Sequence, residues 1–166
     1  MAVDSYKYLP HSMRANYEST RAIEEPAVFE PLPKPIEQCT VALMTSAGVY
    51  LTDTQEAFDL ERERQNPSWG DPTYREIPSD VTQDRIGHAH LHISGEDILK
   101  DVNVVLPFRA FKTLEAEGAI GALAGTAYSF MGFQENNGKT WIEQQGPELA
   151  AKLKERGVDV LLLAPA

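Results

Sequence analysis

Residues 40–48, TVALMTSAG, contain the stretch that decides the fold. The apolar run at 41–45 is typical of a buried strand, and the small residues that follow it predict a turn. A second apolar run, VDVLLL at 158–163, is expected for a strand covered on both faces of a parallel sheet. Strand and helix patterns alternate between these runs, so we expect an α/β protein with a Rossmann-like, three-layer fold and a mostly parallel sheet.

The segments between the two runs supply the remaining elements of the expected fold. Residues 54–64 are expected to form a helix or a polar excursion. Helices are predicted from Pro107 to Gly118, with a further turn at 120–123, and from 146 to 157. Strands are predicted at 85–93 and 126–130, and a short strand or a buried lead-in to the next helix at 102–106. Loops are predicted at 66–78 and 135–139. The strand at 158–163 is expected at an exposed edge of a short sheet, which favours a homo-oligomer or a partner subunit.

The first 38 residues read as an arm that precedes the α/β domain. Leu9, Met13 and Tyr17 follow one another at four-residue steps, which predicts a short amphipathic helix. This helix either packs on its own domain or docks on a second subunit. The Pro-rich stretch EEPAVFEPLPKPIEQ at 24–38 predicts an extended spacer. We therefore expect a helical arm and spacer at 1–38 and an α/β domain at 39–166.

The overall composition argues against several classes of protein. A net charge of −10 without a basic run would repel the phosphates of a nucleic acid. No window approaches about 18 apolar residues, so we expect no membrane span, and the N-terminus lacks the apolar core of a secretory signal. Cys39 is the only cysteine, so no CxxC redox pair exists. We expect a cytoplasmic protein.

Three of the four histidines, His88, His90 and His92, fall within five residues. Alternate residues of a strand point to one face, and imidazole is a common ligand of transition metals. The trio therefore predicts a site for a divalent ion of zinc, copper, iron or nickel, although the outer pair can share one ion only if the strand bends near His90. Carboxylates that could complete the site are Asp71, Glu76, Glu96 and Asp97. A metal-free polar pocket and a chance histidine-rich face are the alternatives.

A second group of candidate residues lies in the segment GDPTYREIP at 70–78. Tyr74, Arg75 and Glu76 bring together a phenol, a guanidinium and an acid, so they are candidate catalytic residues. Arg75 could also bind a substrate carboxylate through two hydrogen bonds. The alternative is that Arg75 holds its own loop together by donating to backbone carbonyls.

A third group follows the first strand. Ligands of open α/β sheets bind beyond the carboxyl ends of strands, so Thr45, Ser46 and Gly48 are candidate substrate-binding residues. No GxGxxG or Walker pattern is present, so a nucleotide is not indicated. Ser46 also lacks the GxSxG context of a hydrolase nucleophile.

Several stretches of the chain resemble the selenoprotein-B subunits of the glycine, sarcosine, betaine and D-proline reductases. In chain order they are PLPKPIEQCTVALMTSAGVYL, FDLERE, GDPTYREIP, DRIGHAH, DVNVVLPF, AEGAIGALAGTAYSFMGF and VDVLLLAP. The resemblance implies a Rossmann-like α/β fold and an ancestral role in reductive cleavage of an amino-acid C–N bond. It also implies that a selenocysteine or cysteine pair just past a strand like VDVLLLAP performs this chemistry.

The chain departs from the family pattern in two respects. It stops at Ala166, where the redox pair would begin, and Cys39 precedes the first strand, so we expect the reductase nucleophile and its exchange chemistry to be missing. His88 and His90 match the family's His-x-His, whereas Leu91 and His92 stand in place of an aromatic–acid pair. A third histidine beside a lost redox motif indicates a change toward metal chemistry.

Two functions follow from these features. The first is a metal-dependent, oxidoreductase-type enzyme on the reductase scaffold that acts on a small amino-acid-like or sulfur- or nitrogen-containing molecule. In this enzyme the three histidines would hold the ion, while Tyr74 and Arg75 would orient the substrate. The alternative is a non-catalytic subunit or binding module that pairs with a partner supplying the redox cysteines.

Overall fold

The computed structural model describes residues 10–12, 31–66, 69–134 and 138–166. Its contacts divide the chain into two units, Met1–Pro31 and Leu32–Ala166, and the second unit carries all the elements given below. The amphipathic helix expected in the arm and part of the turn expected at 135–139 lie outside the described residues. No helix in the described part of the chain is long and apolar enough to cross a membrane.

The centre of the second unit is a five-stranded sheet built around β1 (Thr40–Thr45). β1 pairs in parallel with β7 (Val160–Ala164) on one side. On its other side it pairs, also in parallel, first with β5 (Ala122–Leu123) and then with β6 (Thr126–Phe130). β3 (Tyr74–Pro78) is antiparallel to β6 and lies at one edge. The α/β class and the mostly parallel sheet are therefore confirmed, while Rossmann-like connectivity stays a prediction.

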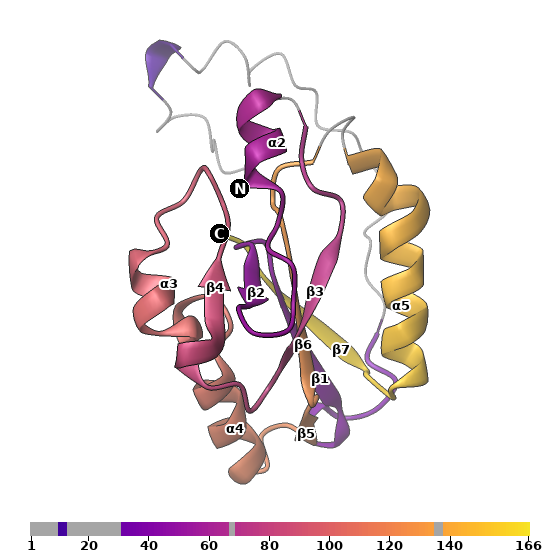
Figure 1. The fold of residues 1–166 in the computed structure, drawn as a ribbon. Coiled ribbons are helices and arrows are strands. Elements are labelled where there is room, and N and C mark those ends of the chain that lie inside the picture. Colours follow the sequence, from indigo (N-terminus) through magenta and orange to yellow (C-terminus); the bar gives the residue numbers. More distant parts are fainter. Residues whose placement is uncertain (1–9, 13–30, 67–68, 135–137) are drawn as a thin grey trace. The chain divides into compact units, whose positions relative to one another are not determined.

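Helices and a small second sheet cover this central sheet (Figure 1). The helices are α2 (Leu60–Gln65), α3 (Glu96–Lys100), α4 (Phe108–Ala116) and α5 (Gly146–Glu155). Short 3₁₀ turns lie at Ile36–Gln38, Gln83–Arg85 and Val102–Val104, and a π-helical turn at Trp141–Gln145 leads into α5. The second sheet pairs β2 (Val49–Leu51) with β4 (Ile86–His88) in antiparallel register.

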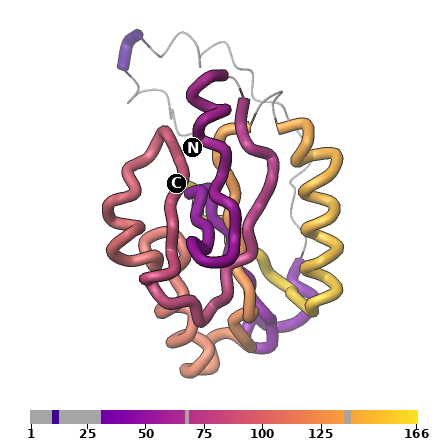
Figure 2. The backbone as a smooth tube through the Cα atoms, viewed as in Figure 1, coloured from indigo at the N-terminus to yellow at the C-terminus, as the bar shows by residue number. Residues whose placement is uncertain are grey.

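Alternate residues of β1 pack against different layers, because successive side chains of a strand point to opposite faces. Leu43 belongs to an apolar cluster with Ile98 of α3 and Phe108 of α4. Ala42 and Met44 belong to a second cluster with residues of α5. Figure 2 shows the sheet between these two helical layers. The expected three-layer arrangement is thus present, and β1 is its most buried strand.

β7 lies at the other edge of the sheet, as expected from the sequence. Among the described strands it pairs only with β1. Leu162 and Leu163 are exposed there, Leu163 to 59%. The expectation that this strand is covered on both faces is therefore wrong, because these successive side chains point to opposite faces of the sheet. The expected association through this edge stays a prediction.

Several elements differ from the sequence-based expectation. In the segment 54–64 only the residues from Leu60 onward are helical, and neither β2 nor α3 was expected. Residues 74–78 form β3 rather than a loop, and residues 122–123 form β5 rather than a helical turn, because both find partners in the central sheet. The strand expected at 85–93 ends at His88, since its partner β2 is only three residues long. The strand expected at 102–106 is a 3₁₀ turn that begins where the side chain of Asp101 accepts a hydrogen bond from the amide of Asn103.

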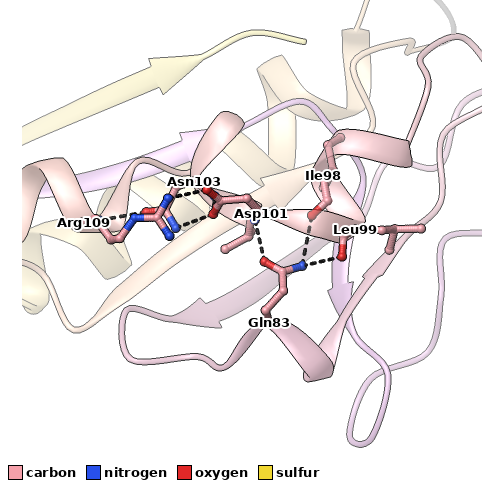
Figure 3. Close-up of polar contacts among 7 residues, drawn as sticks. Gln83, Ile98, Leu99, Asp101, Asn103 and Arg109 are labelled. Atoms are coloured by element: carbon pink, nitrogen blue, oxygen red, sulfur yellow. Dashed lines mark hydrogen bonds and ion pairs between the residues drawn. The ribbon is translucent and has the colours of Figure 1, made fainter.

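Gln83 joins the segments that surround this turn (Figure 3). Its side-chain amide donates to the carbonyls of Ile98 and Leu99, at 3.0 and 3.1 Å, and its side-chain oxygen accepts from the amide of Val102 at 2.6 Å. Two carbonyls at the end of α3 and the first amide of the 3₁₀ turn are satisfied in this way. The side chain of Arg109 pairs with Asp101 next to it, so α4 is tied to the same network.

Gly48 connects the ends of three strands. Its amide donates to the carbonyl of Phe130 at 3.0 Å, and its carbonyl accepts from the amide of Ala89 at 2.9 Å. Its φ of +65° is in the left-handed region, and a Cβ there would lie 2.3 Å from the carbonyl oxygen of Ala89. Only glycine fits this turn, because both the backbone conformation and the space exclude a side chain.

Gly48→Ala is expected to lower the free energy of unfolding by at least about 2 kcal/mol, since strain and a backbone clash add together. Gly118→Ala is the matched control, because its φ is +70° but nothing lies within 4 Å of the added Cβ. That variant is expected to cost about 1 kcal/mol. Urea denaturation of both proteins measures the difference, and equal losses would contradict this account of Gly48.

Candidate functional site

A pocket of about 830 Å³ opens at the carboxyl ends of β1, β6 and β7. Parallel strands end at the same edge of a sheet, so the segments that follow them meet there. The lining residues come from these strand ends and from the loop after β4: Met44, Ser46, His90, His92, Ile93, Phe130, Gly132, Phe133, Leu163, Ala164, Pro165 and Ala166. Most of the wall is apolar, and its polar side chains are one hydroxyl and two imidazoles.

Ser46 ties the strand ends together at the base of this pocket. Its Oγ accepts a hydrogen bond from the amide of Ala166 at 2.9 Å, and its carbonyl accepts from the amide of Gly132 at 3.1 Å. Thr45 and Gly48, the other candidate substrate-binding residues, do not line the pocket. Thr45 is buried, and its Oγ1 accepts from the amide of Ala47 at 3.3 Å.

His88 lies away from the pocket, beside α3. Its ring packs against Gly95 so closely that a Cβ at that position would lie 2.3 Å from Nδ1. Its Nε2 is buried and has no hydrogen-bond partner among the described residues. Burial lowers the pKa of His88 because it disfavours the charged imidazolium. His88 is therefore a neutral, packed side chain at neutral pH.

His90 is buried in the wall of the pocket, with 8% of its surface exposed. Its Nδ1 accepts a hydrogen bond from the backbone amide of His92 at 3.0 Å. Burial lowers the pKa of His90, and the neighbouring imidazoles of His92 and His88 lower it further when they are charged. The ring is therefore neutral, and because Nδ1 is an acceptor, the proton is on Nε2.

His92 lines the same pocket but is more than half exposed. Its Nε2 lies 3.1 Å from Oε1 of Glu63, a residue of α2 whose side chain is only 2% exposed. The ring also contacts Phe133, with the two ring centroids 6.1 Å apart. Sequence reasoning missed Glu63 as a site residue, because nothing in the local pattern of a short charged helix distinguishes it from its exposed neighbours.

The three histidines do not form the expected ligand set for a metal. The rings of His88 and His90 are nearly parallel, with centroids 6.5 Å apart, while His92 turns toward Glu63. The Nδ1 of His90 is already occupied by an amide proton. Across the described ranges, no group of three or more His, Cys, Asp or Glu side chains is placed to hold an ion. The arrangement gives the metal hypothesis no support.

Arg75 donates to backbone carbonyls, as in the alternative that the sequence left open, but it ties β3 to the segment before α2 and not only to its own loop. Its guanidinium donates to the carbonyl of Glu56 at 2.8 Å and to Oγ1 of Thr73 at 2.8 Å. The same group lies over the ring of Phe58, 4.3 Å from its centroid. Arg75 does not line the large pocket, so the structure does not bring it together with the histidines.

Tyr74 and Glu76 belong to an ion-pair network that joins β3 to α5. Oε1 of Glu76 is 2.7 Å from Nζ of Lys152, and Oε2 is 2.9 Å from a guanidinium nitrogen of Arg156. Nζ of Lys152 also donates to the hydroxyl of Tyr74 at 2.9 Å. Partial burial alone would raise the pKa of Glu76, but the hydrogen bonds from Lys152 and Arg156 outweigh it and lower the pKa. None of these residues lines the large pocket.

The fold and the site define an α/β domain with a largely apolar pocket at the carboxyl edge of its parallel strands, where a His-x-His segment follows β4. The chain belongs to the glycine/sarcosine/betaine reductase selenoprotein B family, whose family model matches residues 14–166. This confirms the family expected from the quoted stretches. No solved structure matches the chain.

Two relatives show how much of a longer protein the chain represents. The D-proline reductase subunit gamma of Acetoanaerobium sticklandii is 37% identical over 141 residues, which are 85% of this chain and 54% of the relative. The glycine reductase complex component B subunit gamma of Carboxydothermus hydrogenoformans is 27% identical over 135 residues, 80% of this chain and 29% of the relative. The chain thus spans about half of the first relative and under a third of the second.

The role of Glu76 predicts a specific dependence of stability on pH. The lowered pKa of the folded state means that Glu76 stabilises the fold above its ordinary value of 4.5 and that this contribution is lost as the pH falls through the folded-state pKa. Glu76→Gln is expected to reduce the free energy of unfolding by about 1 kcal/mol at pH 7. The difference from wild type should vanish in acid.

Urea denaturation from pH 3 to pH 7 measures this dependence. Glu115→Gln is the control, because Glu115 is an exposed residue of α4 and its loss should leave the pH profile unchanged. A Glu76→Gln profile that runs parallel to wild type across the whole range would contradict a stabilising role for the network.

Proposed function

We propose that this chain is part of a multi-subunit amino-acid reductase, in which it contributes the pocket at the carboxyl edge of the sheet. The redox thiol or selenol comes from a polypeptide segment other than these 166 residues. Membership of the selenoprotein B family supports this proposal, as do the names of two relatives, each a gamma subunit of a reductase. The proposal develops the alternative of a subunit whose redox residues are supplied from elsewhere.

The position of Cys39 is the observation that carries the proposal. Cys39 is the only cysteine of the chain, and it is fully buried directly before β1. Its Sγ lies 3.4 Å from the carbonyl oxygen of Pro35. The pocket opens at the opposite end of β1, about 20 Å away for six residues of strand. A thiol held there cannot reach a molecule in the pocket.

The lining of the pocket suits a small molecule that meets a redox group at its rim. Its walls are largely apolar, while Ser46, His90 and His92 supply a few polar groups. The carboxyl end of β7 also lies in this wall. The resemblance implies a redox pair just past such a strand, so a segment that follows it in a full-length relative would start beside the pocket.

We expect the chain alone to bind its amino-acid substrate without reducing it. With a dithiol as reductant, the chain alone should not reduce D-proline or glycine, the amino acids named in its relatives, and Cys39→Ser should change nothing. Two-dimensional NMR spectra recorded with D-proline or with glycine measure binding. The amino acid that is the substrate should shift resonances of residues that line the pocket.

Variants test whether this binding uses the pocket. His90→Gln should weaken the Kd about tenfold through the loss of one oriented hydrogen bond, while Glu115→Gln should leave it unchanged. Turnover by the chain alone that Cys39→Ser abolishes would contradict the proposal. Saturable shifts at residues remote from the pocket would contradict it as well.

Metal dependence stays an untested prediction, and elemental analysis of protein purified without an affinity tag tests it. Because His88 packs beside α3, Nδ1 of His90 accepts from an amide and His92 lies against Glu63, we expect no stoichiometric zinc, copper, iron or nickel in the wild type. His90→Ala should match His11→Ala in metal content. One bound ion per chain that is lost in His90→Ala but kept in His11→Ala would restore the metal-dependent enzyme.

A further inference from the structure

Glu63 is a buried carboxylate that the proposed function does not yet use. Its side chain is 2% exposed, although Glu61 and Arg64 on either side of it in α2 are largely exposed. A charged group is costly to bury unless a partner compensates for the lost water. Its Oε1 lies 3.1 Å from Nε2 of His92, yet it has no hydrogen-bond partner of good geometry among the described residues.

The 3.1 Å between these two atoms is the separation of a direct pair, although the structure records no hydrogen bond to Oε1 from any described residue. The Glu63 side chain is buried, whereas the His92 side chain is 58% exposed, so the ring is the member of the pair with more room to turn. A small rotation of the ring would align an Nε2–H with Oε1. We therefore treat the two residues as a carboxylate–imidazole pair, in which a carboxylate holds the proton on the nearer ring nitrogen.

The neighbouring imidazole is fixed in the same tautomer by a different contact. The amide of His92 donates to Nδ1 of His90, which places the proton of that ring on Nε2. Both histidines line the pocket, and their ring centroids are 5.7 Å apart. His90 can thus offer only an Nε2–H donor to a bound molecule.

We propose that Glu63 is a positioning residue, which holds the proton of His92 on Nε2 and so leaves Nδ1 of His92 as the proton acceptor available to the pocket. The pocket then presents one fixed donor, on His90, and one fixed acceptor, on His92. A ligand suited to this pair carries an acidic X–H group that can give its proton to Nδ1, next to a lone pair that accepts the Nε2–H of His90. This inference rests on the proposed use of the pocket.

The tautomer of His92 in the free chain tests the inference. Long-range ¹H–¹⁵N NMR of histidine-labelled protein at pH 8, assigned with His92→Gln, distinguishes a protonated from an unprotonated ring nitrogen. Wild type is expected to show His92 with a single Nε2–H form. Glu63→Met, which fills the buried space without an acceptor, should give a mixture of both tautomers, and Glu63→Gln, which keeps an acceptor oxygen, should retain mainly Nε2–H.

Glu61→Met is the matched control, because Glu61 lies on the same helix and its side chain is 70% exposed. It should leave the His92 signals as in wild type, and thermal unfolding confirms that each variant is folded. A His92 tautomer that is unchanged in Glu63→Met, or an Nδ1–H form in wild type, would overturn the role of Glu63. The measurement needs neither substrate nor partner, so its failure is distinguishable from failure of the proposed reductase function.

Discussion

Hydrogen bonding along both edges of β1, together with burial of both its faces, holds the domain together. Residues 41–45 are all buried, so their peptide groups must find partners within the sheet. Parallel β5, β6 and β7 supply those partners. Because the two faces of β1 are covered by different helices, α4 and α5 must lie on opposite sides of the sheet. The pocket then follows, since three parallel strands end at one edge.

The fold separates two groups of polar side chains that have different roles. Glu76, Lys152 and Arg156 join β3 to α5, and they stabilise the edge of the sheet. Glu63 and the two histidines of the pocket are held at the carboxyl ends of the strands, where a ligand can reach the imidazoles. In the first group the carboxylate of Glu76 pairs with two cations and stabilises the fold. In the second group we infer that the carboxylate of Glu63 fixes which nitrogen of His92 carries the proton.

The elements that depend on their own sequence were predicted well, and those that depend on a distant partner were not. β1, β6, β7, α4 and α5 carry clear apolar patterns, and they lie close to where those patterns place them. β3 lies in a segment rich in proline and glycine, and it is a strand only because β6 supplies its hydrogen bonds. The alternating pattern at 85–93 continues beyond His88, but the strand ends there because β2, its partner, pairs only with residues 86–88.

The sequence by itself determined the α/β class, the buried central strand β1, the position of the edge strand β7 and the family, because apolar runs and short motifs record local requirements for burial. It also placed Ser46, His90 and His92 among the candidate residues, and all three line the pocket. Only the tertiary structure decided that His88 packs away from them and that His92 meets Glu63. The reason is physical: the direction of a side chain and the charge it faces depend on segments that are distant in the sequence and adjacent only after folding.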